Sequence, residues 1–145
     1  MHDPLERIES VKAGSLGGTA TGFGYCLTIA ADRFLGTGPT QSLVSLGLET
    51  AIAIVCGFLF GVTYRYIIRT DCNDQLNSGA VLAFGLVRGL AQVDVAEFEL
   101  AQVWLDGLII GKSVLLFVIA RYLLDQALVA GWLLPFGQAG REGRY

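Results

Sequence analysis

Long uncharged stretches, each bounded by charged or turn-forming residues, dominate the hydrophobic pattern of this chain. The first holds the nineteen uncharged residues between Lys12 and Asp32, and about 20 residues of helix cross the hydrocarbon core of a bilayer. The later stretches are interrupted by single charges only. The pattern predicts an all-α fold, an integral membrane bundle of four transmembrane helices, over residues 13–31, 46–66, 78–93 and 104–122.

The segments between these stretches favour turns and short loops. Residues 36–41 are rich in Gly and Pro, residues 69–77 are polar, and residues 94–99 are acidic. Residues 126–136 are too short to cross again, and Trp132 is a typical interfacial anchor. We therefore expect one membrane domain over 1–145, with a C-terminal interfacial segment over 126–136.

The fourth helix has an alternative placement, over about 107–131. That placement would bury Arg121 at the midplane of the bilayer, where a charge is costly. It ranks below the span over 104–122 for this reason.

Composition and charge narrow the function. The chain of 145 residues is 53% hydrophobic and 16% charged, whereas soluble domains usually carry about 25% charged residues. The net charge is −3 and the sequence holds no basic block, so we expect no nucleic acid among its partners. The lipid bilayer is the expected environment.

Basic residues also predict the orientation of the bundle. They gather near the N-terminus, after the second span and near the C-terminus, which share one side if there are four spans. The opposite side carries the acids Asp32, Asp94, Glu97 and Glu99. Both termini are thus predicted to be cytoplasmic, or stromal in a plastid.

The two halves of the chain resemble each other. In each half a helix carries an acid near its outer end and an Arg-Tyr pair at its inner end: Glu49 with Arg65-Tyr66, and Asp106 with Arg121-Tyr122. Two spans per repeat indicate two tandem helical hairpins.

Glycines recur at a spacing of four residues inside the predicted helices, which lets helix backbones approach closely in lipid. Either they pack the bundle internally, or part of the first helix docks another integral membrane protein. The glycines are Gly14, Gly18, Gly22, Gly57, Gly61, Gly85 and Gly89.

Four charged residues fall inside the apolar stretches: Glu49, Arg88, Asp106 and Lys112. The first three are expected in one layer near the outer boundary, with Lys112 about 9 Å deeper than Asp106. They form either structural ion pairs, including Arg88 with Asp106, or a polar path for protons or ions.

The sequence offers little for catalysis or metal binding. Its single histidine is His2, and it holds no CxxC or HExxH motif. A Ser-His-acid or Cys-His arrangement within the membrane is excluded by that one terminal histidine. We predict no catalytic residue, no metal and no cofactor, whereas contact with a pigment or lipid stays open through other ligands.

The stretch FGVTYRYIIRTDCNDQLNSGAVLAFGLVRGLAQVD over 60–94 resembles small multi-span proteins of cyanobacterial and plastid membranes. The resemblance implies a thylakoid or cyanobacterial membrane and a link to photosynthesis. Together with the glycines it favours a non-catalytic accessory or assembly subunit of a larger membrane complex. The alternatives are a transporter or channel subunit acting as a homo-oligomer, and a scaffold that binds pigment or lipid.

Overall fold

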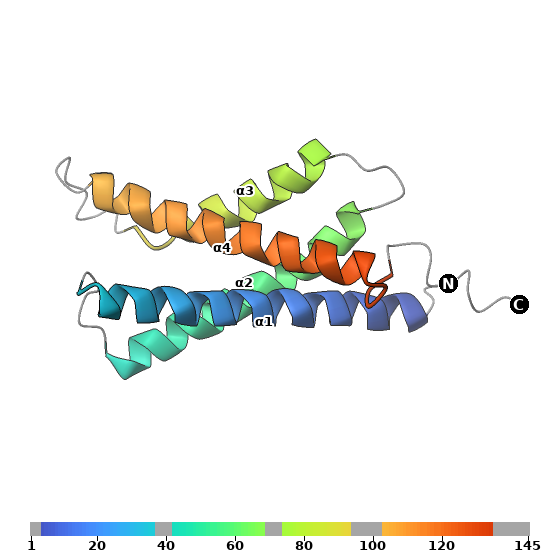
Figure 1. Cartoon of the computed structure of the whole chain (residues 1–145), viewed down its shortest axis with the longest axis horizontal. Helices are drawn as coiled ribbons and strands as arrows, with labels where there is room; N and C mark the ends of the chain where they lie inside the picture. Colours follow the sequence, from blue (N-terminus) through green and yellow to red (C-terminus); the bar gives the residue numbers. More distant parts are fainter. Residues whose placement is uncertain (1–3, 37–41, 69–73, 94–102, 135–145) are drawn as a thin grey trace, which may run out of the picture.

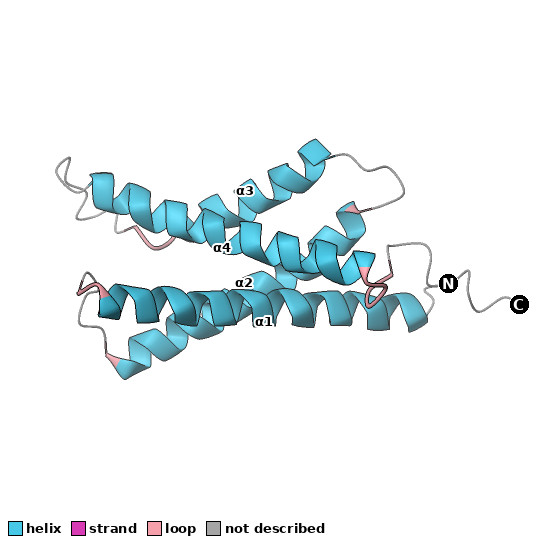
Figure 2. Ribbon diagram, in the orientation of Figure 1, coloured by secondary structure: helices cyan, strands magenta, loops and turns pink. Residues whose placement is uncertain are grey.

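The computed structural model describes residues 4–36, 42–68, 74–93 and 103–134. These residues form four α-helices that run alternately up and down, so that α1 begins and α4 ends at the same end of the bundle (Figure 1). Short turns make up the rest of the described chain (Figure 2). The all-α prediction is confirmed; the helices are α1 (Pro4–Phe34), α2 (Leu43–Ile67), α3 (Asp74–Leu90) and α4 (Val103–Val129).

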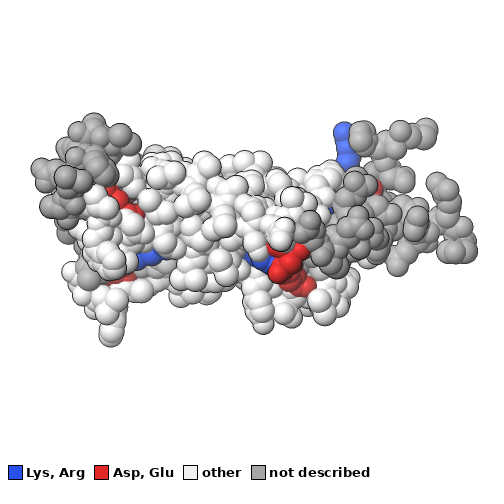
Figure 3. Space-filling view, turned by 90° about the horizontal axis from the view of Figure 1, so that it is seen from above, with Lys and Arg blue, Asp and Glu red and all other residues white. Residues whose placement is uncertain are grey.

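Two described helices, α2 and α4, are long and apolar enough to cross a membrane. They have 25 and 27 residues, with mean hydropathy 2.1 and 2.0 in their most apolar windows. On the face shown in Figure 3, charged side chains lie toward the two ends of the described bundle, with an uncharged band between them. These features favour a membrane protein, while the count of four spans stays a prediction.

All four helices begin before their predicted spans, and α3 ends three residues early, at Leu90; the largest differences are in α1 and α4. Helix α1 begins at Pro4, well before the expected start at 13, and Pro suits the first helical position because its missing N–H has no partner there. Helix α4 continues to Val129, through the first part of the segment expected at the interface. Leu124 and Ala127 are buried in the core, so this last part of α4 is held by packing.

The end of α4 is a Schellman motif. Gly131 has a φ of +74°, and the backbone N–H of Trp132 donates to the carbonyl oxygen of Ala127 at 2.9 Å. Gly131 itself donates to Leu128 at 3.1 Å. Glycine adopts this left-handed conformation without a Cβ clash. The chain thus reverses after Val129, and the rest of the predicted interfacial segment, from 135, lies outside the described residues.

Helices α1 and α2 form a first hairpin through direct contact of their backbones. A Cβ on Gly57 would lie 1.9 Å from the Thr21 hydroxyl oxygen and 2.5 Å from the Gly17 carbonyl oxygen. One on Gly61 would lie 2.2 Å from the Ala13 carbonyl oxygen. The buried Thr21 hydroxyl donates to the carbonyl oxygen of Ala53 at 2.8 Å, a polar contact of the kind that joins helices in lipid.

Helices α3 and α4 form a second hairpin, and aromatic side chains fill the space between the two hairpins. Phe60 of α2 packs edge-on against Phe84 of α3 and Phe117 of α4, with ring centroids 5.5 and 5.2 Å apart. Phe60 and Phe117 are fully buried. These three rings, called here the aromatic layer, close the middle of the bundle.

The first helix, the end of α2 and the turn after α4 meet at a buried arginine. Arg65 forms an ion pair with Glu6 at 2.5 Å and donates to the Ser10 hydroxyl at 2.7 Å and to the Leu134 carbonyl oxygen at 2.9 Å. We call these four residues the Arg65 cluster. It holds together three segments that are far apart in sequence.

A second acid supports the same end. The Glu9 carboxylate accepts hydrogen bonds from Lys12 at 2.6 Å and from the backbone N–H of Leu134 at 3.3 Å. Burial raises the pKa of Glu9, but these two donors and the nearby Arg65 charge outweigh burial, so the pKa is lowered from its ordinary value. The ionised form of Glu9 therefore fits the folded protein better than the neutral form.

Candidate binding cavity between the hairpins

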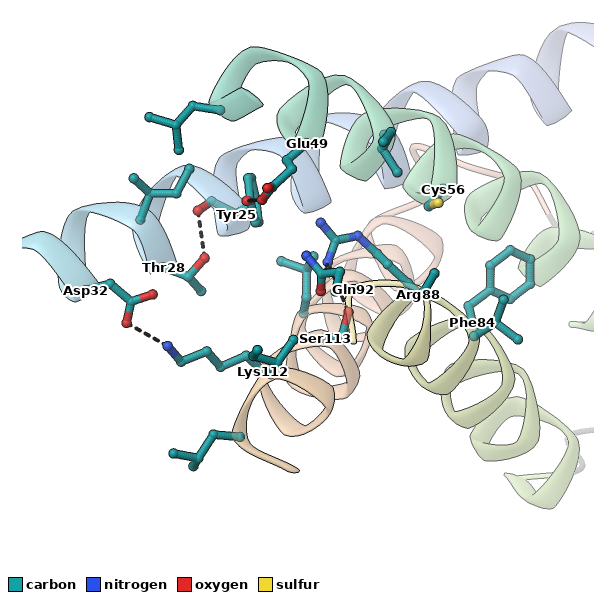
Figure 4. Close-up of a pocket in the computed structure, with 18 of the residues that line it drawn as sticks. Tyr25, Thr28, Asp32, Glu49, Cys56, Phe84, Arg88, Gln92, Lys112 and Ser113 are labelled. Atoms are coloured by element: carbon teal, nitrogen blue, oxygen red, sulfur yellow. Dashed lines mark hydrogen bonds and ion pairs between the residues drawn. The ribbon is translucent and has the colours of Figure 1, made fainter. Parts of the chain in front are cut away.

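A cavity of about 1290 Å³ lies between the two hairpins, at the end of the bundle opposite the Arg65 cluster. All four helices line it: the last turns of α1 and α3, residues 46–59 of α2 and the first half of α4. Figure 4 shows polar side chains from α1, α2, α3 and α4 converging on it. We call it the binding cavity.

Helix α1 presents one polar face to the binding cavity. Tyr25, Thr28 and Asp32 follow at spacings of three and four residues and all line the cavity. Residues at these spacings lie on the same side of a helix. Because α1 continues to Phe34, Asp32 lies within the helix and faces inward.

The first charged residue from the predicted set, Glu49 of α2, lies opposite this face. Its carboxylate accepts a hydrogen bond from the Tyr25 hydroxyl. The contact ties the start of α2 to the second half of α1. It also places a carboxylate on the cavity wall, where it is partly buried.

Arg88 of α3 is the most buried charge in the binding cavity. It is 6% exposed, and its guanidinium carbon lies 5.0 Å from the centre of the Tyr25 ring, within the range of a cation–π contact. Its Nη1 donates to the Ser113 hydroxyl at 3.0 Å and to the Gln92 side-chain oxygen at 3.3 Å. Its Nε is buried and has no hydrogen-bond partner.

Lys112 of α4 pairs with α1 across the mouth of the cavity. Its ammonium group lies 2.6 Å from the Asp32 carboxylate, and Figure 4 shows the two side chains extended toward each other. The side chain of Lys112 is 47% exposed, so this pair is far more accessible than Arg88. Pairs of this exposure contribute little stability, about 0–1 kcal/mol.

Apolar side chains make up the rest of the lining of the binding cavity. Leu46, Ile52 and Leu59 of α2 face it from one hairpin, and Leu105 and Leu108 of α4 from the other. Phe84, from the aromatic layer, lines the cavity at the centre of the bundle. The cavity thus combines buried polar groups, such as Arg88 and Ser113, with an extensive apolar lining.

Three of the four predicted charges meet in the cavity. Glu49, Arg88 and Lys112 line it, whereas Asp106 is not among its lining residues. The expected pairing of Arg88 with Asp106 is not among the ion pairs of the described residues, and Lys112 instead pairs with Asp32. The sequence predicted that Lys112 lies deeper in the membrane than the other three charges. In the structure, α1 places the Asp32 carboxylate within reach of the Lys112 ammonium group.

Six polar residues that line the cavity were not predicted as site residues: Tyr25, Thr28, Asp32, Arg33, Gln92 and Ser113. The spacing of Tyr25, Thr28 and Asp32 could have indicated a polar face on the first helix. Ser113 follows Lys112 directly, and a lone serine in an apolar helix gives no such signal.

The predicted glycines lie at contacts between helices. Gly14, Gly18, Gly22, Gly57 and Gly61 pack α1 against α2, while Gly85 and Gly89 pack α3 against Val114 and Ile110 of α4. In none of the seven does the added Cβ position point to open space. The glycines therefore serve packing within this chain.

Within the described ranges, no group of three or more His, Cys, Asp or Glu side chains is placed to hold a metal ion. The chemistry that the binding cavity can offer is hydrogen bonding, charge pairing and apolar contact.

Comparison of the chain with protein-family models, with curated proteins and with solved structures finds no match. The resemblance of residues 60–94 to cyanobacterial and plastid membrane proteins, and the thylakoid setting that it implies, stay predictions.

Proposed function

We propose that this chain is an integral membrane protein of four helices that binds a small amphipathic molecule in the binding cavity and catalyses no reaction on it. One observation carries the proposal: a cavity of about 1290 Å³ is lined by several polar groups together with leucine and isoleucine side chains. Small-molecule sites commonly measure about 300–1,000 Å³ and are mostly apolar with a few placed polar groups.

The lengths of the less apolar helices are compatible with four spans. From Lys12 to Asp32 helix α1 rises about 30 Å, which equals the thickness of the hydrocarbon core. Helix α3 has 17 residues, at the lower limit for a span. In the predicted orientation the binding cavity opens toward the side opposite the cytoplasm, near the outer ends of the spans.

The accessory-subunit hypothesis stays a prediction. Its sequence argument was a glycine-lined docking face, and the glycines of α1 are engaged with α2. Large apolar side chains such as Phe23 and Leu27 still point outward from α1, at 70% and 55% exposure. They suit contact with lipid as well as contact with another membrane protein.

The transport alternative receives less support from a single copy of the chain. A path through the bundle would have to pass the aromatic layer, in which Phe60 and Phe117 are fully buried. The arrangement favours a cavity that ends inside the bundle. Transport would require several copies to enclose a path between them.

Native mass spectrometry of the protein purified in mild detergent tests the binding function. We expect the protein to retain a co-purified amphiphile, and Ala83→Trp to weaken its retention, because Ala83 lines the cavity and the indole would take up part of its space. Ala51→Trp is the matched control: Ala51 is exposed on α2 and is not among the lining residues.

The two variants separate the outcomes. Weaker retention of the bound mass in Ala83→Trp but not in Ala51→Trp supports the proposal. A wild-type protein that carries no small molecule, and that acquires none from added lipid extract, would refute it.

A further inference from the structure

We infer that the binding cavity selects amphiphiles with an anionic head group, and that Arg88 binds that head group. The inference rests on the proposed binding function and adds the chemical class of the ligand.

The first argument is the burial of a positive charge that forms no ion pair with the described residues. Arg88 is 6% exposed, and its Nη1 donates to two neutral acceptors, Ser113 and Gln92. Neither acceptor neutralises the guanidinium, and among the described residues Arg88 forms no ion pair. A buried charge without a counter-charge is strongly unfavourable. An anion bound beside Arg88 would remove this penalty.

The second argument concerns the acids around Arg88. Asp32 forms an ion pair with Lys112, whereas Glu49 accepts a hydrogen bond from the neutral Tyr25 hydroxyl and keeps its negative charge. Three basic residues and two acidic ones line the cavity: Arg33, Arg88 and Lys112, with Asp32 and Glu49. The lining therefore carries an excess of one positive charge, which matches a ligand with a single negative charge.

The third argument is the chemistry of the donor. A buried Nε beside the Nη groups leaves one edge of the guanidinium without a hydrogen-bond partner at Nε. Two adjacent N–H donors match the two oxygens of a carboxylate or of a phosphate group. Reaching Nε requires a small movement of the side chains that now cover it.

The fourth argument concerns the rest of the ligand. Beyond Arg88 the cavity is bordered by apolar side chains, among them Phe84, Ile109 and Leu116. A free inorganic anion would leave these apolar side chains uncovered, whereas an acyl chain would pack against them. The cavity therefore favours an anionic group attached to an apolar chain.

Dodecanoate carrying a terminal fluorophore, and the methyl ester of the same molecule, are the probes that test this. Both have the same chain, but only the first is charged. We expect the wild-type protein in neutral detergent to bind the carboxylate at least about tenfold more tightly than the ester, because a hydrogen bond to a charged group contributes enough for one decade.

Variants then locate the head group. Arg88→Gln should bring the two affinities together while ester binding remains, and Arg88→Lys should retain part of the preference. Arg121→Gln is the matched control, because it makes the same substitution at an arginine that binds Asp74 and does not line the cavity. It should keep the preference for the carboxylate.

The possible results have distinct meanings. Equal affinities for carboxylate and ester in the wild type overturn the inference about the head group and leave the binding function standing. Failure to bind either probe overturns both. Acetate and inorganic phosphate are anions without an apolar chain. If either displaces the fluorescent carboxylate at concentrations at which the ester does not, the inference that the ligand is an amphiphile is wrong. The wild-type comparison needs no variant, so the test stands even where Arg88→Gln does not fold.

Discussion

The two hairpins are closed by the same device at the same end of the bundle. In the first, Arg65 of α2 binds Glu6 and Ser10 of α1. In the second, Arg121 of α4 binds an acid and a serine with the same spacing on α3, Asp74 and Ser78. The shared closure, together with the Arg-Tyr pairs in the sequence, supports a tandem repeat of one hairpin.

The hairpins differ in how tightly their helices meet. In the first, glycines face glycines, and the Cβ position of Gly17 lies 2.3 Å from the carbonyl oxygen of Gly57. In the second, Gly85 faces the Cα of Val114 at 2.7 Å, so only one partner lacks a side chain. The side chain of Arg65 is 1% exposed and that of Arg121 is 23% exposed. The first hairpin is the more tightly built half.

When the two hairpins are aligned on these closing residues, they differ at the positions of the proposed site. Arg88 stands fourteen residues after Asp74, and the position fourteen residues after Glu6 is Ala20. Ser113 stands eight residues before Arg121, and the matching residue before Arg65 is Gly57. Where the first hairpin has residues that let helices close, the second has a hydrogen-bonded polar pair. The difference indicates that the first hairpin supplies close helix contact and that the second supplies the buried positive charge of the cavity.

The largest expected effect comes from breaking the close contact of the first hairpin. Gly61→Ala should lower the free energy of unfolding by about 3 kcal/mol or more, because overpacking against backbone is not relieved by a rotamer change. The added Cβ would meet the Ala13 carbonyl oxygen. Thermal unfolding followed by circular dichroism in detergent measures it.

The matched control lies in the same helix. Nothing lies within 4 Å of the Cβ position of Gly47, so Gly47→Ala should leave stability unchanged or raise it by up to about 1 kcal/mol. Equal effects of the two substitutions would mean that the hairpin does not depend on close backbone contact.

The next effect compares the two closing arginines. Arg65→Gln leaves Glu6 without its ion pair in a buried setting and should cost about 3 kcal/mol. Arg121→Gln should cost less than about 1 kcal/mol, because its partner Asp74 is 85% exposed. Chemical unfolding of both variants in the same detergent gives the two values. A larger loss for Arg121→Gln would reverse the assignment of the tighter hairpin.

The sequence predicted the existence and order of the helices better than it predicted their ends or their contacts. Four apolar stretches, separated by polar or turn-forming segments, indicated four helices. A long apolar stretch can be recognised without knowing which other segments it contacts. The pairing of Lys112 with Asp32 could not be read in this way, since it depends on the rotation of α4 about its axis and on the length of α1. The continuation of α4 to Val129 depends likewise on the packing of Leu124 and Ala127 in the core.

The smallest expected effect is a dependence on pH that belongs to the first hairpin alone. Glu9 follows Glu6 by three residues, and the matching residue after Asp74 is Asn77, which does not titrate. The pKa of Glu9 is lowered from its ordinary value of 4.5. A carboxylate of this kind contributes stability that is complete above 4.5 and is lost as the pH falls through the lowered pKa.

Wild type and Glu9→Gln should therefore differ at neutral pH and converge in acid. Because Lys12, the partner of Glu9, is 55% exposed, we expect a difference of about 1 kcal/mol or less. Unfolding curves of both proteins across the acid range measure it. The other carboxylates titrate in both proteins, so the difference isolates Glu9. If the difference in the free energy of unfolding stays constant into acid, the Glu9 carboxylate acts through packing. Charge at this position would then not distinguish the first hairpin from the second.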